Sequence, residues 1–158
     1  MFAKPKKQIT EQKALLRLSA LCSQAEHSSG EMMDKMRRWM LPADVAERIL
    51  DRLIAERFVD DERFARFFVR DKIRFDRWGR RKIEQALYKK GVASDISHRV
   101  LDAVPADDYV EILRPLLAAK RRTLKADSDY ELNCKLIRFA MGRGFDMDVI
   151  RKCVDIPL

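Results

Sequence analysis

The sequence predicts an all-α protein made of three tandem three-helix repeats in an elongated, curved array. Composition is the first observation: the 158 residues include only 5 Gly and 5 Pro, which argues against a turn-rich β protein. Leu, Ala, Arg, Lys, Glu and Met are abundant, and all of them favour helix. The second observation is a unit of about 50 residues that recurs along the chain. We therefore expect repeats at residues 8–57, 58–105 and 106–158.

The first repeat begins with a capped helix. Thr10 precedes the stretch EQKALLRLSALCSQAEH, whose apolar residues recur at spacings of three and four. Ser28 and Ser29 offer the cap of a second helix, which carries three methionines on one face. Pro42 ends that helix or opens the third, so this repeat contains three helices.

The second and third repeats align closely with each other. A helix after Gly79 stops at Gly91, a residue typical of the position just past a helix end, and Gly144 stands in the same place in the third repeat. The first repeat is looser and has Met40 where the glycine would be. The first helix of the third repeat contains Pro115, which predicts a kink or a late helix start. The aligned apolar positions are Ile83, Leu87, Val92, Ile96, Val100 and Leu101 in the second repeat, Leu136, Ala140, Phe145, Val149, Cys153 and Val154 in the third, and Met32, Met36, Leu41, Val45, Ile49 and Leu50 in the first.

Two aspartate doublets open equivalent helices, Asp60-Asp61 in the second repeat and Asp107-Asp108 in the third. Paired carboxylates can also serve acid–base chemistry or bind a metal, but both uses need partner groups, and none is visible nearby in the sequence. A doublet that recurs at the head of equivalent helices is better explained as a helix-start signal. Its carboxylates accept the free N–H groups of the first turn and complement the positive end of the helix.

The cysteines and histidines do not form a recognisable site. Cys22, Cys134 and Cys153 are far apart and never in a C-x-x-C pattern, and His27 and His98 are distant from them and from each other. We expect reduced cysteines, no metal, no cofactor and no catalytic residue, so the chain is not expected to be an enzyme.

Charge and hydropathy restrict the class of partner. The net charge is +8 and the pI is near 9.6, which favours a polyanionic partner such as nucleic acid. No apolar run approaches the roughly 18 residues of a membrane span. The start, MFAKPKKQIT, has no apolar segment of a secretory signal. We expect a monomeric cytoplasmic protein without membrane contact.

Positive charge is concentrated in the middle repeat, where ten bases and only three acids lie between Arg66 and Lys90. Four arginines at spacings of four, four and three predict one ridge along one helix. Three further bases open the next helix, where they oppose the helix dipole, and this favours an external anionic partner. A merely solvated helix face is the alternative. The candidate partner- or DNA-binding residues are Arg66, Arg70, Arg74 and Arg77 of the ridge, Arg80, Arg81 and Lys82 of the helix start, and Lys89 and Lys90 at its end.

Two tryptophans lie at predicted helix ends. Trp39 and Trp78 each have arginine beside them in the sequence. We expect them to be wedges between repeats, with stacking on bases or insertion into a partner's pocket as the alternatives.

The middle repeat resembles the signature region of the RecX family of bacterial recombinase regulators. The stretch RFVDDERFARFFVRDKIRFDRWGRRKIEQALYKKGV carries the resemblance, and the similarity extends over nearly the whole chain. Two departures concern helix ends: Arg57 and Phe58 replace the usual glycine–aromatic pair before the doublet, and Arg80 stands where a proline often follows the glycine. The matching residues are Asp60, Asp61, Phe64, Ala65, Val69, Gly79, Ile83, Leu87, Lys90, Gly91 and Val92.

The resemblance implies a function that composition alone does not reach. RecX-like proteins, themselves built of three tandem three-helix units, bind the RecA nucleoprotein filament along its groove and limit its growth, ATP hydrolysis, strand exchange and coprotease role in the SOS response. A row of small helical units suits such a track physically, because it offers a long, thin surface. The competing hypothesis is a helical-repeat protein that binds DNA directly, single- or double-stranded, without contacting RecA. It predicts salt-sensitive binding to bare DNA.

Overall fold

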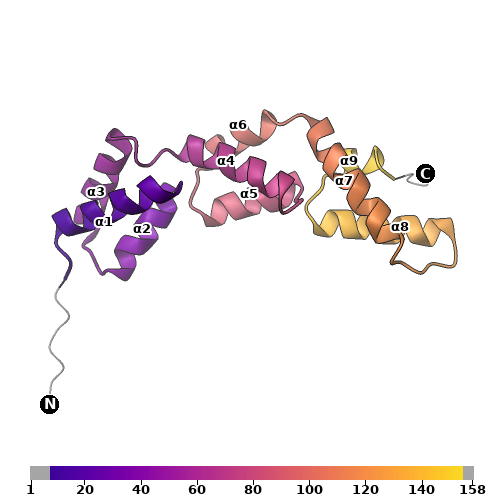
Figure 1. Ribbon diagram of the computed structural model, residues 1–158, viewed down its shortest axis with the longest axis horizontal. Helices are drawn as coiled ribbons and strands as arrows, with labels where there is room; N and C mark the ends of the chain where they lie inside the picture. The colour runs from indigo at the N-terminus through magenta and orange to yellow at the C-terminus, as the bar shows by residue number, and fades with distance from the viewer. Residues whose placement is uncertain (1–7, 155–158) are drawn as a thin grey trace, which may run out of the picture.

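Nine helices and no strand make up residues 8–154, the part of the chain that this computed structural model describes. They form three groups of three along an elongated row (Figure 1). The predicted all-α repeat fold is confirmed. The helices are α1 (Glu11–Gln24), α2 (Ser29–Arg38) and α3 (Ala43–Ala55), then α4 (Asp61–Arg74), α5 (Arg80–Lys89) and α6 (Ser94–Asp102), and finally α7 (Ala106–Arg121), α8 (Asp129–Gly142) and α9 (Met147–Arg151).

Four helices begin at a side chain that caps them. Thr10 accepts a hydrogen bond from a first-turn N–H of α1, and Ser28 forms a reciprocal capping box with Glu31 in α2. Asp60 does the same for α4 and Ser128 for α8, each accepting from the N–H three residues on at 3.1 Å. The caps predicted at Thr10, Ser28 and Asp60 are therefore confirmed.

In each group of three helices, the middle helix ends in the same kind of turn. The residues at the turn have positive φ: +58° at Met40, +75° at Gly91 and +92° at Gly144. The following residue donates its N–H to the carbonyl five residues earlier at 3.1 Å in all three turns, which is the bond of a Schellman ending. The first repeat thus adopts the glycine turn without a glycine, as the alignment at Met40 indicates.

Buried apolar side chains form two separate cores. The first lies within α1–α3 and the segment that follows, and is made of Ala14, Leu18, Met32, Met36, Ala46, Ile49, Leu53 and Val59. The second is continuous through the other two groups, from Phe64 in α4 to Val154 after α9. The α4–α6 and α7–α9 groups therefore behave as one packed body, to which the first repeat is joined by other means.

Backbone meets backbone where neighbouring groups touch. A Cβ added to Gly30, at the start of α2, would meet the Lys90 carbonyl and would lie 2.7 Å from the Cα of Gly91. A Cβ on Gly79, before α5, would collide in the same way with Gly144 and Phe145. Both joints bring the start of one group's middle helix against the glycine turn of the next group. Glycine is required at both because no side chain fits between the chains.

Of the two alternatives predicted at Pro115, the late helix start is excluded, and the predicted cap of the same helix is wrong. α7 runs from Ala106 to Arg121 through Pro115, so the helix does not start late. Pro105 is the N-cap of α7 and no side chain caps this helix, so the capping role predicted for Asp107 and Asp108 is wrong, although both lie in the first turn. The preceding proline sets the helix start by its fixed φ, and the carboxylates are left free for other contacts.

Candidate partner-binding surface

The basic ridge is a feature of α4 and contains three arginines. Arg66, Arg70 and Arg74 recur at every fourth residue, on the side of α4 away from its most deeply buried positions. None of the three forms an ion pair with any residue in the described range 8–154. The guanidinium of Arg70 lies 5.1 Å from the centre of the Phe67 ring. Their charge is thus left available to a partner.

Arg77 is not part of this ridge, contrary to the spacing argument. α4 ends at Arg74, and Arg77 lies in the following turn with φ +56°, so it no longer follows the helical repeat. Its carbonyl accepts a hydrogen bond from the guanidinium of Arg143 at 3.1 Å, which ties this turn to the third group.

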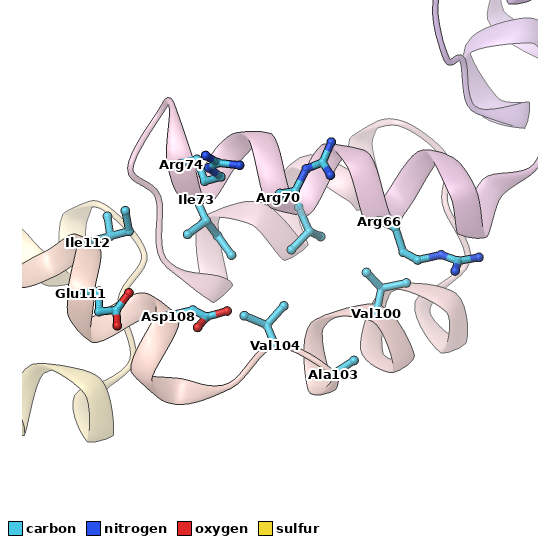
Figure 2. A pocket seen from close by; sticks show the side chains of 11 residues that line it. Arg66, Arg70, Ile73, Arg74, Val100, Ala103, Val104, Asp108, Glu111 and Ile112 are labelled. Carbon is cyan, nitrogen blue, oxygen red and sulfur yellow. The ribbon is translucent and has the colours of Figure 1, made fainter.

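The ridge borders a groove of about 470 Å³ between α4 and the α6–α7 segment (Figure 2). Its apolar lining comes from the edges of the shared core. On the far side, α7 contributes two exposed carboxylates, Asp108 and Glu111. Neither forms an ion pair within the described residues. The groove therefore has arginines along one wall, apolar side chains below, and acids at one end of the opposite wall.

The bases that open α5 are mostly engaged inside the molecule. Arg80 forms an ion pair with Asp102 at 2.6 Å. Burial disfavours its charged form, but the hydrogen bond and charge of Asp102 outweigh this and raise the pKa of Arg80. The ammonium of Lys82 lies 4.6 Å from the centre of the Trp78 ring. The N–H of Arg81 donates to the Gly144 carbonyl at 3.0 Å, so a neighbouring turn supplies the negative groups that this helix start needs.

A smaller basic surface remains on the outer side of α5. Arg81 and Lys89 line a shallow hollow beside Tyr88, which is 81% exposed. Lys90 belongs to the joint with the first repeat instead: its carbonyl accepts from Ser28 Oγ at 2.5 Å and its ammonium lies 3.8 Å from Glu31. The nine predicted residues are thus divided between a groove, an outer surface and internal contacts.

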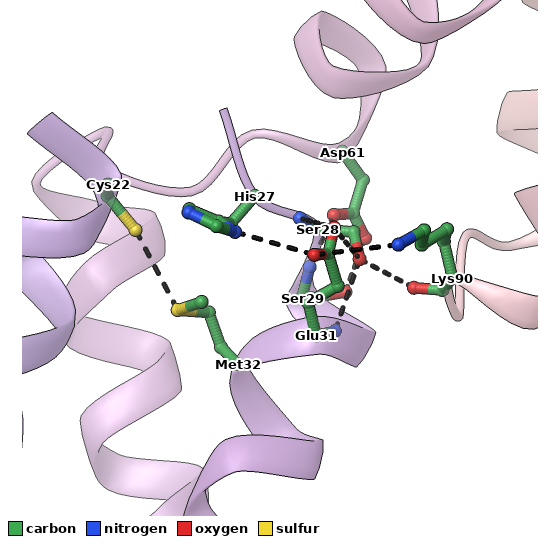
Figure 3. A network of polar contacts seen from close by, with 8 residues as sticks. All are labelled: Cys22, His27, Ser28, Ser29, Glu31, Met32, Asp61 and Lys90. Carbon is green, nitrogen blue, oxygen red and sulfur yellow. Dashed lines mark hydrogen bonds and ion pairs between the residues drawn. The ribbon is translucent and has the colours of Figure 1, made fainter. Parts of the chain in front are cut away.

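The second aspartate of the first doublet links two repeats. Asp61 accepts hydrogen bonds from the backbone N–H of Ser29, at 2.7 Å, and from its hydroxyl (Figure 3). Arg63 reaches back to Glu26 in the same joint at 2.7 Å. Asp60 and Asp61 are therefore structural, as predicted, but only Asp60 caps its own helix. Asp61 acts at the positive end of α2.

The two tryptophans lie in different cores. Trp39 packs against the first core, and Trp78 packs against the second. The ammonium groups of Lys72 and Lys82 lie 4.8 and 4.6 Å from the centre of the Trp78 ring. The two indole rings therefore belong to separately packed parts of the molecule.

Residues 8–154 contain neither a cluster of metal ligands nor a membrane-spanning helix. No group of three or more His, Cys, Asp or Glu in this range could hold a metal ion. No helix in the same range is long and apolar enough to cross a membrane.

Sequence reasoning missed the acidic end of the groove and the bond from Asp61 to Ser29. The aspartate doublet predicts a helix cap at Asp108, and Glu111 carries no motif. The signal that could have located them is the helical spacing of three between the two acids, which places them on one face of α7. That spacing becomes meaningful only when α4 is known to lie opposite.

Two family models match the chain. The model for the second three-helix domain of RecX matches residues 60–101, and the model for the third three-helix domain of RecX matches residues 107–154. Together they span more than half of the chain.

Curated relatives carry the same name. The regulatory protein RecX of Prosthecochloris aestuarii is 32% identical over 145 residues, which are 90% of this chain and 92% of the relative. That of Chlorobium limicola is 31% identical over 85% of this chain and 82% of its own length. That of Clostridium perfringens is 32% identical over 78% of this chain, but the match spans only 58% of the relative.

Solved structures share the fold. The crystal structure of RecX from Lactobacillus salivarius superimposes with a TM-score of 0.81 at 22% identity, covering 90% of this chain and 93% of the other. A crystal structure of a regulatory protein RecX gives a TM-score of 0.83 at 22% identity, covering 90% and 72%.

Proposed function

We propose that this chain, which belongs to the RecX family of regulatory proteins, binds RecA nucleoprotein filaments and limits their ATP hydrolysis, strand exchange and coprotease activity. The name shared by its relatives supports a regulatory role, and the resemblance of its middle repeat to the family signature supports RecA as the partner. An elongated row of helical groups can lie along a filament and touch several subunits at once.

The observation that carries this proposal is the row of unpaired arginines on α4. Arg66, Arg70 and Arg74 recur at every fourth residue of one helix and remain without an ion pair among the described residues. Three like charges on one ridge repel each other, so the arrangement costs stability unless a partner neutralises it. Complementary charge on a filament would speed encounter and fix register.

DNA-dependent ATP hydrolysis by RecA from the same organism, titrated with this protein, tests the proposal. We expect inhibition well below one protein per RecA. Reversing Arg66, Arg70 and Arg74 to Glu should raise the half-inhibiting concentration by on the order of tenfold to a hundredfold, since each exposed charge contributes up to about 1 kcal/mol. Unchanged ATP hydrolysis at equimolar wild-type protein would refute the proposal.

A control variant with the same change in net charge isolates the ridge. Arg17, Arg38 and Arg122 are exposed and lie outside the groove. Reversing all three to Glu should leave inhibition within about twofold of wild type if the contact depends on the ridge rather than on net charge. Equal losses in both triple variants would assign the effect to non-specific attraction.

The second candidate function is direct binding to DNA. The observation that favours it is the exposed Tyr88 ring, which lines one hollow together with Arg81, Lys89 and Glu84; an aromatic ring beside two bases can stack on a base near a phosphate. It predicts tight, steeply salt-dependent binding to bare DNA without RecA, which Tyr88→Ala and Arg81→Glu would weaken. Binding to bare DNA together with no effect on RecA would favour this candidate.

A further inference from the structure

The groove beside α4 holds charges of both signs that do not neutralise each other. Arg66, Arg70 and Arg74 lie along the α4 rim of the groove, with the guanidinium groups of Arg70 and Arg74 directed away from α7, while Asp108 and Glu111 lie on the opposite side, from α7 (Figure 2). No ion pair within 4.0 Å joins the two sides. Elsewhere in the described chain such opposites do meet, as in the pair of Arg63 and Glu26 at 2.7 Å. A partner with acidic groups beside α4 and a basic group beside α7 would therefore complement the charges of the groove.

Apolar surface is open between these charges. Val104 and Ile112 line the groove and are only half-buried, although both pack against the shared core. Exposed apolar surface in a concave site of about 470 Å³ is typical of a binding pocket, within the common range of roughly 300–1,000 Å³. An aliphatic or aromatic side chain placed here would be removed from water, which is favourable in proportion to the area buried.

The groove is preformed. Its walls come from α4 and α6 of the second group and from α7 of the third, and one continuous core connects these helices. A partner would not have to order the site before binding, which removes the part of the association cost that comes from ordering the groove.

The chemistry of the groove disfavours nucleic acid as its occupant. Asp108 and Glu111 would repel a phosphate backbone that followed the arginines past Arg74. Valine and isoleucine side chains offer no hydrogen bond to a base edge. A polypeptide can satisfy all three features at once, because acidic, apolar and basic side chains can occur within one short segment.

We propose that this groove binds one segment of a partner protein, with acidic side chains along α4, an apolar side chain over Val104 and Ile112, and a basic side chain at Asp108 and Glu111. The inference rests on the proposed function, in which that partner is the filament protein. The opposite charges at the two walls fix the direction in which the segment lies. The outer surface at Arg81, rather than the groove, is then left for any DNA.

Charge reversal of Glu111 tests whether the groove binds a protein segment or nucleic acid, because the two occupants predict opposite changes in affinity. Glu111 is exposed and unpaired among the described residues, so Glu111→Lys should fold normally. Binding is measured for RecA filaments on single-stranded DNA and, separately, for the same oligonucleotide without RecA. We expect about tenfold weaker binding to the filament and slightly tighter binding to bare DNA. Tighter binding to both probes would show that the groove carries nucleic acid and would overturn the inference.

Filling the groove with a bulky side chain tests whether the partner binds there. Ala103 lines it and is exposed, so Ala103→Trp adds bulk without disturbing the core. Ala55→Trp, at the exposed end of α3, is the matched control. We expect at least about tenfold weaker filament binding for Ala103→Trp and wild-type binding for Ala55→Trp. Wild-type binding by Ala103→Trp refutes the groove but leaves the proposed function standing, whereas a wild-type protein that does not bind filaments refutes both.

Discussion

Replacing Asp61 with alanine is expected to uncouple the first repeat from the rest of the molecule. The Asp61 carboxylate is half-buried and accepts two hydrogen bonds from Ser29, across a joint that shares no apolar core. Hydrogen bonds to a charged group contribute about 1.5–3 kcal/mol, and the carboxylate also complements the positive end of α2. We expect a loss of about 2 kcal/mol, confined to the stability that the first repeat gains from its neighbour.

The two tryptophans make this measurable. Trp78→Phe leaves Trp39 as a reporter of the first core, and Trp39→Phe leaves Trp78 as a reporter of the second. In urea, with a slope of about 1–1.5 kcal/mol per molar for a unit of this size, the Trp39 midpoint should fall by roughly 1.3–2 M while the Trp78 midpoint stays within error.

Asp60→Ala is the matched control, because its carboxylate caps α4 within the second group. It should cost about 1 kcal/mol and shift the Trp78 midpoint. If Asp61→Ala moved both midpoints by the same amount, or left the Trp39 midpoint unchanged, the reasoning about the joint would be wrong.

Two further predictions concern backbone strain, and a third concerns a buried phenol. Arg57 has φ +62°, so Arg57→Gly should raise the free energy of unfolding by roughly 0.5–1 kcal/mol in a urea titration; a decrease would contradict this. Gly91→Ala should lower it by about 2–3 kcal/mol, because φ is +75° and the new Cβ would lie 2.7 Å from Gly30, while Gly142→Ala, with open space around it, should be neutral or slightly stabilising. Burial raises the pKa of Tyr109 to about 12, so the folded state holds the phenol proton more tightly and stability should fall between pH 10 and 12. Tyr109→Phe should flatten that part of the pH dependence in chemical unfolding, and an unchanged pH profile would exclude Tyr109 as its source.

The repeat pattern of the fold could be predicted because it depends on local signals. Apolar spacing, side-chain caps and the glycine turn each act within a few residues, so Met40 could be aligned with Gly91 and Gly144 before its positive φ was known. Arg57, which stands where the family resemblance leads us to expect glycine, likewise has a left-handed φ of +62°.

The candidate site could be predicted only in part. The row of Arg66, Arg70 and Arg74 follows from helical spacing, whereas the turn that removes Arg77 from the row does not. The acids at the far wall of the groove, the pairing of Arg80 with Asp102 and the bond from Asp61 to Ser29 all join segments far apart in sequence. Such contacts depend on how helices pack, which periodicity within one helix does not determine.

The two joints have a consequence for how this protein can change through evolution. In each, a polar group at the start of a helix donates to a backbone carbonyl of the next group's turn: Ser28 Oγ to Lys90 at 2.5 Å, and the Gly79 N–H to Arg143 at 2.9 Å. The acceptor exists whatever side chain stands at the turn, and glycine keeps the chains in contact. The distance between successive groups is therefore set independently of the outward-facing side chains. The exposed residues can therefore change toward different partners, while the spacing between successive groups stays constant.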